Sequence, residues 1–133
     1  MQIYYRALRR LIWVKFGTSR QPPPPPQRVK EVVTTRYGSD LRLLLEGGGY
    51  GRTGWIALTS QEVFFISGNL EKAIPFSEIV ESKISKGPWY DYVLVATKTD
   101  RQVFRIYKCD KDVSQDFFNQ VQLRLGAVHF PAH

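Results

Sequence analysis

The chain has 133 residues, 43% of them hydrophobic and 23% charged, and a formal net charge of +7 at pH 7. A chain of this length buries one hydrophobic core, which excludes a large multidomain enzyme. The longest stretches without Asp, Glu, Lys or Arg are nine residues long, well short of the roughly 18 apolar residues that a membrane-spanning helix needs. The single cysteine, Cys109, excludes an internal disulfide.

The excess positive charge lies at the start of the chain. Residues 1–36 contain eight Lys or Arg and one acid, Glu31, whereas the remaining 97 residues contain eleven bases and eleven acids. A basic leader on a neutral body indicates attraction to an anionic partner, such as a membrane surface, a nucleic acid or an acidic protein face. Arginines interrupt the apolar start too often for a secretory signal, so we expect a cytoplasmic protein.

Residues 1–17 predict a basic amphipathic arm. On a helix, Arg6, Arg9 and Arg10 fall within one arc of about 100°, and most apolar residues occupy the remainder. Cationic and aromatic side chains together are typical of segments that lie on anionic bilayers. A nucleic-acid partner is disfavoured because it leaves the aliphatic content unexplained. The candidate partner-binding or membrane-binding residues are Arg6, Arg9, Arg10, Trp13, Lys15 and Phe16.

Residues 18–28 predict a linker, because five consecutive prolines occupy positions 22–26. Proline fixes φ and lacks the amide proton, so such a run is a stiff polyproline II spacer. Two alternatives stay open. The prolines could be a ligand for an SH3-like groove, and the arm could pack on its own body in place of a partner.

Residues 29–126 predict one domain of seven short strands and a closing helix. The strands are rich in β-branched and aromatic residues and are separated by turn residues. Residues 29–37 fit either a strand or a helix. The predicted strands are Leu41–Glu46, Trp55–Thr59, Glu62–Ser67, Lys72–Phe76, Val80–Ser85, Asp91–Lys98 and Gln102–Lys108.

The closing segment, residues 112–125, predicts an amphipathic helix. Val113, Phe117, Val121 and Leu125 recur at every fourth position, Asp110 or Asp112 is placed to cap the start, and Gly126 is expected to end the helix. Residues 127–133 form a tail. The fold class is therefore mainly β with a C-terminal α-helix, in the form of a seven-stranded antiparallel barrel or sandwich.

Two segments resemble the pleckstrin-homology (PH) superfold, in particular its bacterial and GRAM-like branch. They are Gly54-Trp-Ile-Ala-Leu-Thr-Ser-Gln-Glu-Val-Phe-Phe-Ile66 and Ala73-Ile-Pro-Phe-Ser-Glu-Ile79. The resemblance implies a PH-like barrel capped by one helix and a binding module without catalysis. Phosphoinositide-binding members carry several basic residues in their first hairpin, whereas residues 47–54 offer only Arg52. We therefore do not expect a dedicated inositol-phosphate pocket.

The body offers little material for catalysis. Gly49, Gly51 and Gly54 match G-x-G-x-x-G, but a strand pattern follows them where a dinucleotide fold needs a helix, so we interpret the motif as a hairpin. Both histidines lie in the last five residues, which leaves no general base in the body. The aspartates fall at turns, at a strand edge and at a helix start, where capping and solvation explain them. We expect no enzyme, cofactor, metal site or small-molecule substrate.

The sequence Trp89-Tyr90-Asp91-Tyr92 predicts a possible second interface, together with Tyr50 and Arg52. Exposed aromatics supply much of the energy of protein interfaces, although alternate members of the cluster could face the core. The most economical hypothesis is a peripheral accessory subunit of a membrane-associated protein complex, docked through its arm. The alternative is an autonomous lipid-binding protein that recognises anionic membrane surfaces.

Overall fold

The computed structural model describes residues 2–4, 25–107 and 112–129. Each of the seven predicted strands forms, with ends that differ from the predicted ones by at most three residues. In chain order the elements are β1 (Gln2–Tyr4), α2 (Gln27–Tyr37), the 3-10 turn η1 (Gly38–Asp40), β2 (Leu41–Gly49), β3 (Arg52–Thr59), β4 (Glu62–Ser67), β5 (Leu70–Pro75), the 3-10 turn η2 (Phe76–Glu78), β6 (Ile79–Lys86), β7 (Tyr90–Thr97), β8 (Arg101–Tyr107) and α3 (Val113–His129).

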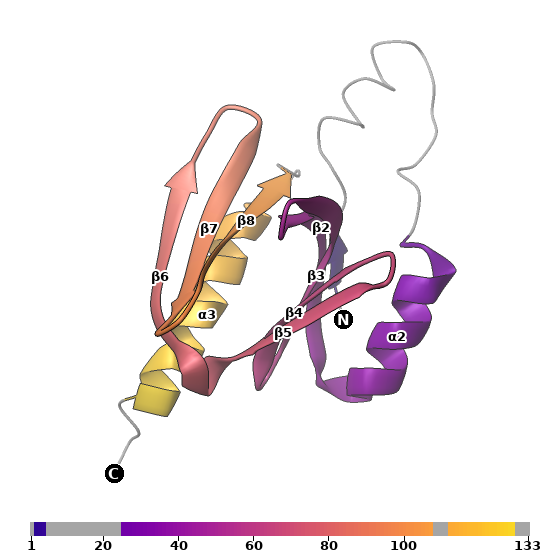
Figure 1. Ribbon diagram of the computed structural model, residues 1–133, viewed down its shortest axis with the longest axis horizontal. Coiled ribbons are helices and arrows are strands. Elements are labelled where there is room, and N and C mark those ends of the chain that lie inside the picture. The colour runs from indigo at the N-terminus through magenta and orange to yellow at the C-terminus, as the bar shows by residue number, and fades with distance from the viewer. Residues whose placement is uncertain (1, 5–24, 108–111, 130–133) are drawn as a thin grey trace.

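Strands β2 to β8 form an antiparallel sheet in the order β5-β4-β3-β2-β8-β7-β6. The strands β2 and β8 share only the pairs Gly47↔Ile106 and Gly48↔Arg105. This short junction divides the sheet into a first half-sheet, β2–β5, and a second half-sheet, β6–β8, which stand side by side in Figure 1. The predicted fold class, mainly β with seven antiparallel strands and a C-terminal helix, is confirmed.

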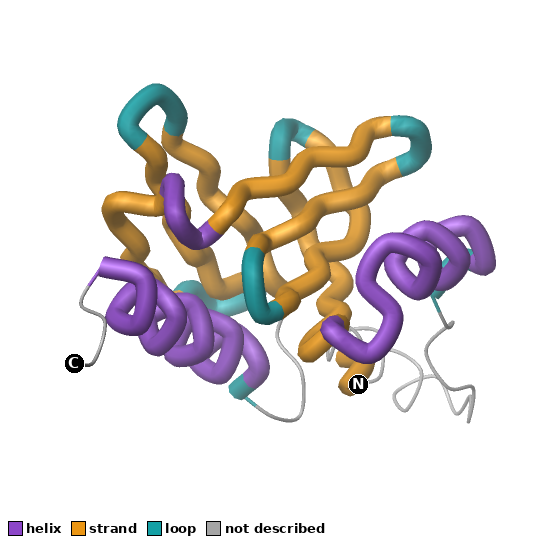
Figure 2. The backbone as a smooth tube through the Cα atoms, turned by 90° about the horizontal axis from the view of Figure 1, so that it is seen from below, coloured by secondary structure: helices purple, strands orange, loops and turns teal. Residues whose placement is uncertain are grey.

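Helix α3 closes the core between the two half-sheets. Its apolar residues Val113, Phe117, Val121 and Leu125 lie in one buried cluster with residues of both half-sheets, as the fourfold spacing predicts. Figure 2 shows α3 and α2 at opposite ends of the molecule. The predicted end at Gly126 is wrong, because this glycine keeps a helical backbone and the helix continues to His129. Neither described helix is long and apolar enough to cross a membrane.

Helix α2 covers the outer face of the first half-sheet. Val29 and Val33 are four residues apart on one side of the helix and are buried in a second cluster, with Leu44 and Phe64 of the sheet. The strand alternative for residues 29–37 is therefore wrong. The local β-branched run is overridden by tertiary packing. Because α2 begins at Gln27, the last two residues of the predicted linker are helical.

Polar contacts fix both ends of α2 at the edge of the first half-sheet. Near its start, Arg28 lies 3.3 Å from Glu71. At its end, Arg36 Nη2 lies 3.4 Å from Glu62 Oε2, and the Tyr37 hydroxyl donates a hydrogen bond to the same oxygen. Burial, followed by the hydrogen bond to Glu62, raises the pKa of Tyr37 above its usual range. The helix is thus held by an apolar stripe with a charged contact at each end.

Strand β1 lies on the body of the same chain. It pairs in parallel with β2 through Gln2↔Leu43, Ile3↔Leu44 and Tyr4↔Leu45. Further along the chain, β2 pairs with β8 through Gly47 and Gly48. For these three residues the predicted amphipathic helix is wrong, and the alternative of packing on the body holds. The candidate arm residues Arg6, Arg9, Arg10, Trp13, Lys15 and Phe16 lie outside the described residues.

Candidate functional site

The glycine-rich segment forms the turn between β2 and β3. Gly49 pairs with Arg52, and the two residues between them, Tyr50 and Gly51, have φ values of 52° and 74°. Two positive φ values define a two-residue hairpin turn whose twist matches the flanking strands. The interpretation of the G-x-G-x-x-G match as a hairpin is confirmed.

The structure separates the four residues of the predicted second interface. Tyr50 is partly buried, and its ring lies 5.7 Å from that of Phe65 and 6.2 Å from that of Phe104. Burial, reinforced by the charge of Asp100, raises the pKa of Tyr50. Tyr50 therefore packs against the edge of the core. Arg52, in contrast, is exposed at the start of β3.

Trp89 and Tyr90, in contrast, are consecutive residues at the start of β7. Trp89 is 60% exposed in the turn between β6 and β7, and Tyr90 begins the outer face of the second half-sheet. Along β7 and β8 the outward side chains alternate with buried ones, which contribute to the core. We call this outer surface the β7–β8 face; its residues are Tyr90, Tyr92, Leu94, Val103 and Arg105.

The β7–β8 face keeps apolar and aromatic surface in contact with solvent. Tyr92 is 39% exposed and Val103 is 47% exposed. They lie on neighbouring strands, because Tyr92 pairs with Arg105 and Leu94 pairs with Val103. Exposed aromatic side chains next to an arginine are the composition that protein interfaces enrich. The sequence analysis named Tyr92 within the aromatic cluster but missed Val103 and Arg105, although the alternation along β8 could have indicated them.

Arg105 is held in a fixed position by two tyrosine rings. Its guanidinium carbon lies 5.0 Å from the ring centre of Tyr90 and 5.7 Å from that of Tyr107. Its Nη2 donates a long hydrogen bond of 3.4 Å to the Tyr107 hydroxyl. Its Nε is buried and has no hydrogen-bond partner among the residues that the structure describes. The side chain is therefore oriented by stacking and keeps unused donors.

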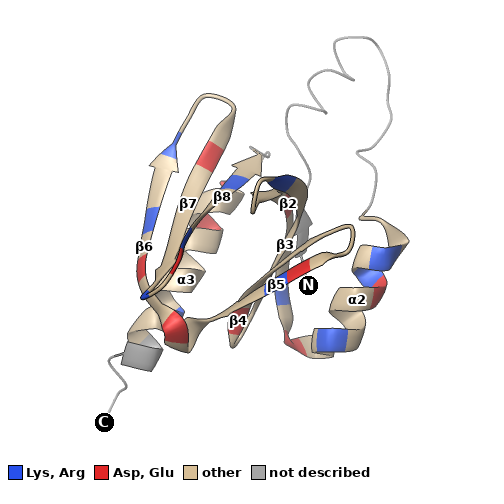
Figure 3. Cartoon of the chain, in the orientation of Figure 1, with Lys and Arg blue, Asp and Glu red and all other residues tan. Residues whose placement is uncertain are grey.

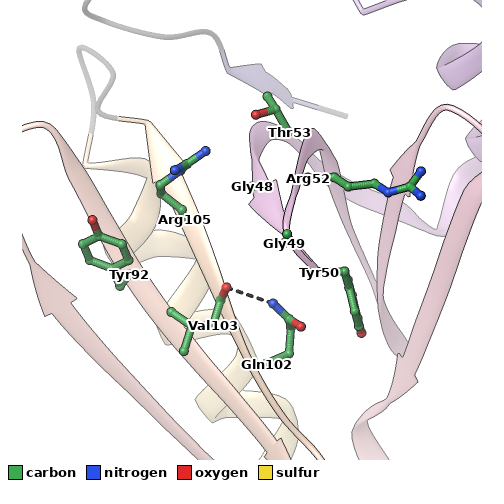
Figure 4. A pocket seen from close by; sticks show the side chains of 10 residues that line it. Gly48, Gly49, Tyr50, Arg52, Thr53, Tyr92, Gln102, Val103 and Arg105 are labelled. Carbon is green, nitrogen blue, oxygen red and sulfur yellow. Dashed lines mark hydrogen bonds between the residues drawn. The ribbon is translucent and has the colours of Figure 1, made fainter.

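A hollow of about 320 Å³ lies between Arg105 and the β2–β3 hairpin. Figure 4 shows the Arg105 side chain extending toward the hairpin. The Arg52 side chain, on the hairpin itself, points away from Arg105. The described residues around the hollow include no acid; they are Gly48, Gly49, Tyr50, Gly51, Arg52, Thr53, Tyr92, Gln102, Val103 and Arg105. The site thus offers one oriented cation beside partly apolar walls.

Basic residues also lie at the border of the β7–β8 face. Lys83 of β6 and Arg101 of β8 both pair with Glu81, at 3.4 Å and 3.8 Å. Figure 3 shows basic bands on β6 and β8. These two cations are exposed and already have a carboxylate partner, which distinguishes them from Arg105.

A polar cluster ties the β6–β7 hairpin, which carries Trp89, to the start of α3. Lys86 Nζ lies 2.6 Å from Asp112 Oδ1 and 3.5 Å from Asp91 Oδ2, and Ser114 Oγ donates to Asp91. The hydrogen bond from Lys86 lowers the pKa of Asp112. The expected solvation of Asp91 is wrong, because this residue is 3% exposed. The cluster therefore holds the β6–β7 hairpin against the start of α3.

Comparisons with known proteins do not assign the chain to a family. No protein-family model and no curated protein matches the chain. Among solved structures, the chain is similar to one titled "Critical structural role for the PH and C1 domains of the Vav1 exchange factor", with 9% identity and a TM-score of 0.49. The match covers 95% of this chain and 34% of that one. The chain therefore spans about a third of its length, and the bacterial or GRAM-like branch stays a prediction.

Proposed function

We propose that this chain is a non-catalytic PH-like module that acts as a peripheral accessory subunit of a membrane-associated protein complex. In this proposal the basic arm docks the chain, through Arg6, Arg9, Arg10, Trp13, Lys15 and Phe16, and the β7–β8 face contacts a protein. The chain is cytoplasmic and attaches to the membrane only at its surface. The GRAM-like branch is part of the proposal.

The observation that carries this proposal is the β7–β8 face. It exposes Tyr92 and Val103 beside an arginine that stacks on a tyrosine, on a half-sheet whose inward side chains lie in the core. Large aromatic side chains of low conformational freedom are efficient anchors for a partner. The segregation of charge supports a second attachment, because the body from residue 37 onward has equal numbers of acids and bases.

The alternative is an autonomous lipid-binding protein, and the composition of the arm supports it. Each basic residue near an anionic bilayer contributes about 1 kcal/mol of attraction, and this attraction weakens with salt. A protein interface with apolar anchors is less sensitive to salt. The two functions are therefore distinguished by what the chain binds and by how binding responds to ionic strength.

The test is native purification of the tagged chain from solubilised membranes, with mass spectrometry of the accompanying proteins. Two variants are compared with the natural chain: an arm variant with Arg6, Arg9 and Arg10 replaced by Gln, and a face variant with Tyr92→Ala and Val103→Ala. Leu123→Ala is the matched control, because Leu123 is 72% exposed on α3 and lies away from the face.

A defined set of membrane proteins that the control retains and that both variants lose would support the accessory subunit. If the chain purifies alone but floats with vesicles of phosphatidylcholine and phosphatidylserine, and the arm variant does not float, then the lipid-binding alternative holds. Retention of the same proteins by the face variant would remove the β7–β8 face from the proposal.

A further inference from the structure

Arg105 is prepared to accept an anionic group. Stacking on Tyr90 and Tyr107 restricts its rotamers in advance, so little side-chain entropy is lost when a ligand binds. A buried guanidinium nitrogen without an acceptor has given up hydration without replacing it. An acceptor that enters the hollow would pair with the guanidinium nitrogens other than the buried Nε. Among the described residues, no carboxylate lies within ion-pair distance of Arg105. Lys83 and Arg101, in contrast, each pair with Glu81.

The hairpin can approach the guanidinium closely because residue 48 is glycine. A Cβ atom at this position would lie 3.2 Å from Arg105 Nη2 and 3.3 Å from its Nε. Such an atom would crowd the guanidinium. The missing side chain therefore lets the guanidinium lie against the hairpin at the border of the hollow, with Nε buried.

The surroundings of Arg105 select the class of anion. A headgroup with several phosphates needs several converging cations, but Figure 4 shows the Arg52 side chain pointing away from the hollow. The remaining walls include the exposed Tyr92 and Val103. One guanidinium beside apolar side chains is complementary to one carboxylate beside an apolar side chain. That combination is found in an acidic peptide segment.

We infer that the β7–β8 face binds an acidic peptide segment of a protein partner. One Asp or Glu carboxylate of the segment pairs with Arg105, and a neighbouring aliphatic or aromatic side chain packs on Tyr92 and Val103. This inference rests on the proposed role of the face as a partner surface. It does not depend on the arm or on membrane attachment.

The probe is a phage-displayed library of random 12-residue peptides, selected on the full chain. The expected result is enrichment of Asp or Glu next to an apolar residue. Synthetic forms of an enriched peptide, with the acid intact or changed to its amide, are then titrated by fluorescence anisotropy. The acid form should bind at least about tenfold more tightly, because a charge-assisted hydrogen bond is lost in the amide.

Two variants locate the carboxylate. Arg105→Gln should lose the preference for the acid form, whereas the control Arg101→Gln, on the same strand, should keep it. Because Arg105 also packs on two tyrosines, Val103→Glu is a second variant at an exposed position. It places a carboxylate next to Arg105 and should weaken binding of the acid form at least about tenfold, with unchanged thermal unfolding.

Three outcomes would overturn the inference. They are a selection without acidic enrichment, equal affinity for the acid and amide forms, and an acid preference that survives Arg105→Gln. Arg105-dependent binding to phosphatidylcholine vesicles that contain a phosphoinositide, without peptide binding, would also overturn it. If only the accessory-subunit proposal fails, the natural chain will purify without accompanying membrane proteins, and its peptide binding will be intact.

Discussion

The two half-sheets differ in what lies against their outer faces. On the first half-sheet, α2 buries Phe64 to 1% exposure, whereas on the second, Tyr92 is 39% exposed and Val103 is 47% exposed. The inner faces of both half-sheets meet α3 in one core. An apolar residue that points outward from the sheet is therefore part of the core where another element covers it. Where no described element covers it, the residue is part of a candidate interface. The four predictions below test that difference.

The largest expected effect is a difference in stability between two alanine variants, one at an aromatic residue on each outer face. Phe64→Ala should lower the free energy of unfolding by about 3–5 kcal/mol, because it leaves a cavity under α2. Tyr92→Ala should lower it by less than about 1 kcal/mol, because solvent already reaches this ring. Chemical denaturation of both variants measures the difference. Equal losses would mean that the β7–β8 face is as much a part of the core as the α2-covered face.

The same comparison can be made with valines, in which the substitution is identical. Val33 is 1% exposed and Val103 is 47% exposed. Val33→Ala removes two buried methyl groups and should cost about 2 kcal/mol. Val103→Ala should change stability by no more than about 0.5 kcal/mol. If Val33→Ala is also neutral in denaturation, then α2 does not hold the sheet in the way its buried contacts indicate.

A third pair compares the charges at the borders of the two faces. Glu62 accepts contacts from Arg36 and Tyr37 with its side chain 19% exposed, whereas Glu81 pairs with Lys83 at 37% exposure. Glu62→Gln should cost about 1–2 kcal/mol, because hydrogen bonds to a charged group are weakened at a sheltered site. Glu81→Gln should cost at most about 0.5 kcal/mol. The reverse order in thermal unfolding would contradict the anchoring of α2 by Glu62.

Much of the fold can be predicted from the sequence because its signals are local. The period-2 strands end at turn residues, and Phe117 and Val121 recur at helical spacing, so the strands and α3 need no tertiary information. The role of residues 29–37 could not be decided locally. Their β-branched run suits a strand, and the helix forms because Val29 and Val33 fit against a sheet face made by later residues.

The candidate site was harder to predict than the fold. Trp89 and Tyr90 were identified from composition, but Tyr50 packs on Phe65 and Phe104 across the mouth of the core. Arg105 was not singled out in the sequence. Its stacked position depends on pairing with β7, which places Tyr90 beside the guanidinium, whereas Tyr107 lies two residues further along β8. Such long-range juxtaposition has no signature in the residues next to Arg105.

The smallest expected effect concerns the hairpin that carries Trp89 beside the β7–β8 face. The hydrogen bond from Lys86 lowers the pKa of Asp112 in the folded state. A carboxylate with a lowered folded-state pKa stabilises the fold above its unfolded pKa, near about 4, and this stabilisation is lost as the pH falls through the folded-state value. Because Asp112 is 61% exposed, solvent screening keeps the contribution small.

Asp112→Asn should therefore slightly reduce stability at pH 6 and flatten the loss of stability between pH 5 and pH 3, measured by urea denaturation across that range. Asp116→Asn removes a carboxylate from the first turn of α3, just after Asp112, without removing a contact of Lys86, and it should retain the natural slope. If both variants keep the natural slope, the Lys86–Asp112 contact does not hold the β6–β7 hairpin on α3. The β6–β7 hairpin would then be held against α3 by the hydrogen bond from Ser114 to Asp91 and by the shared apolar core.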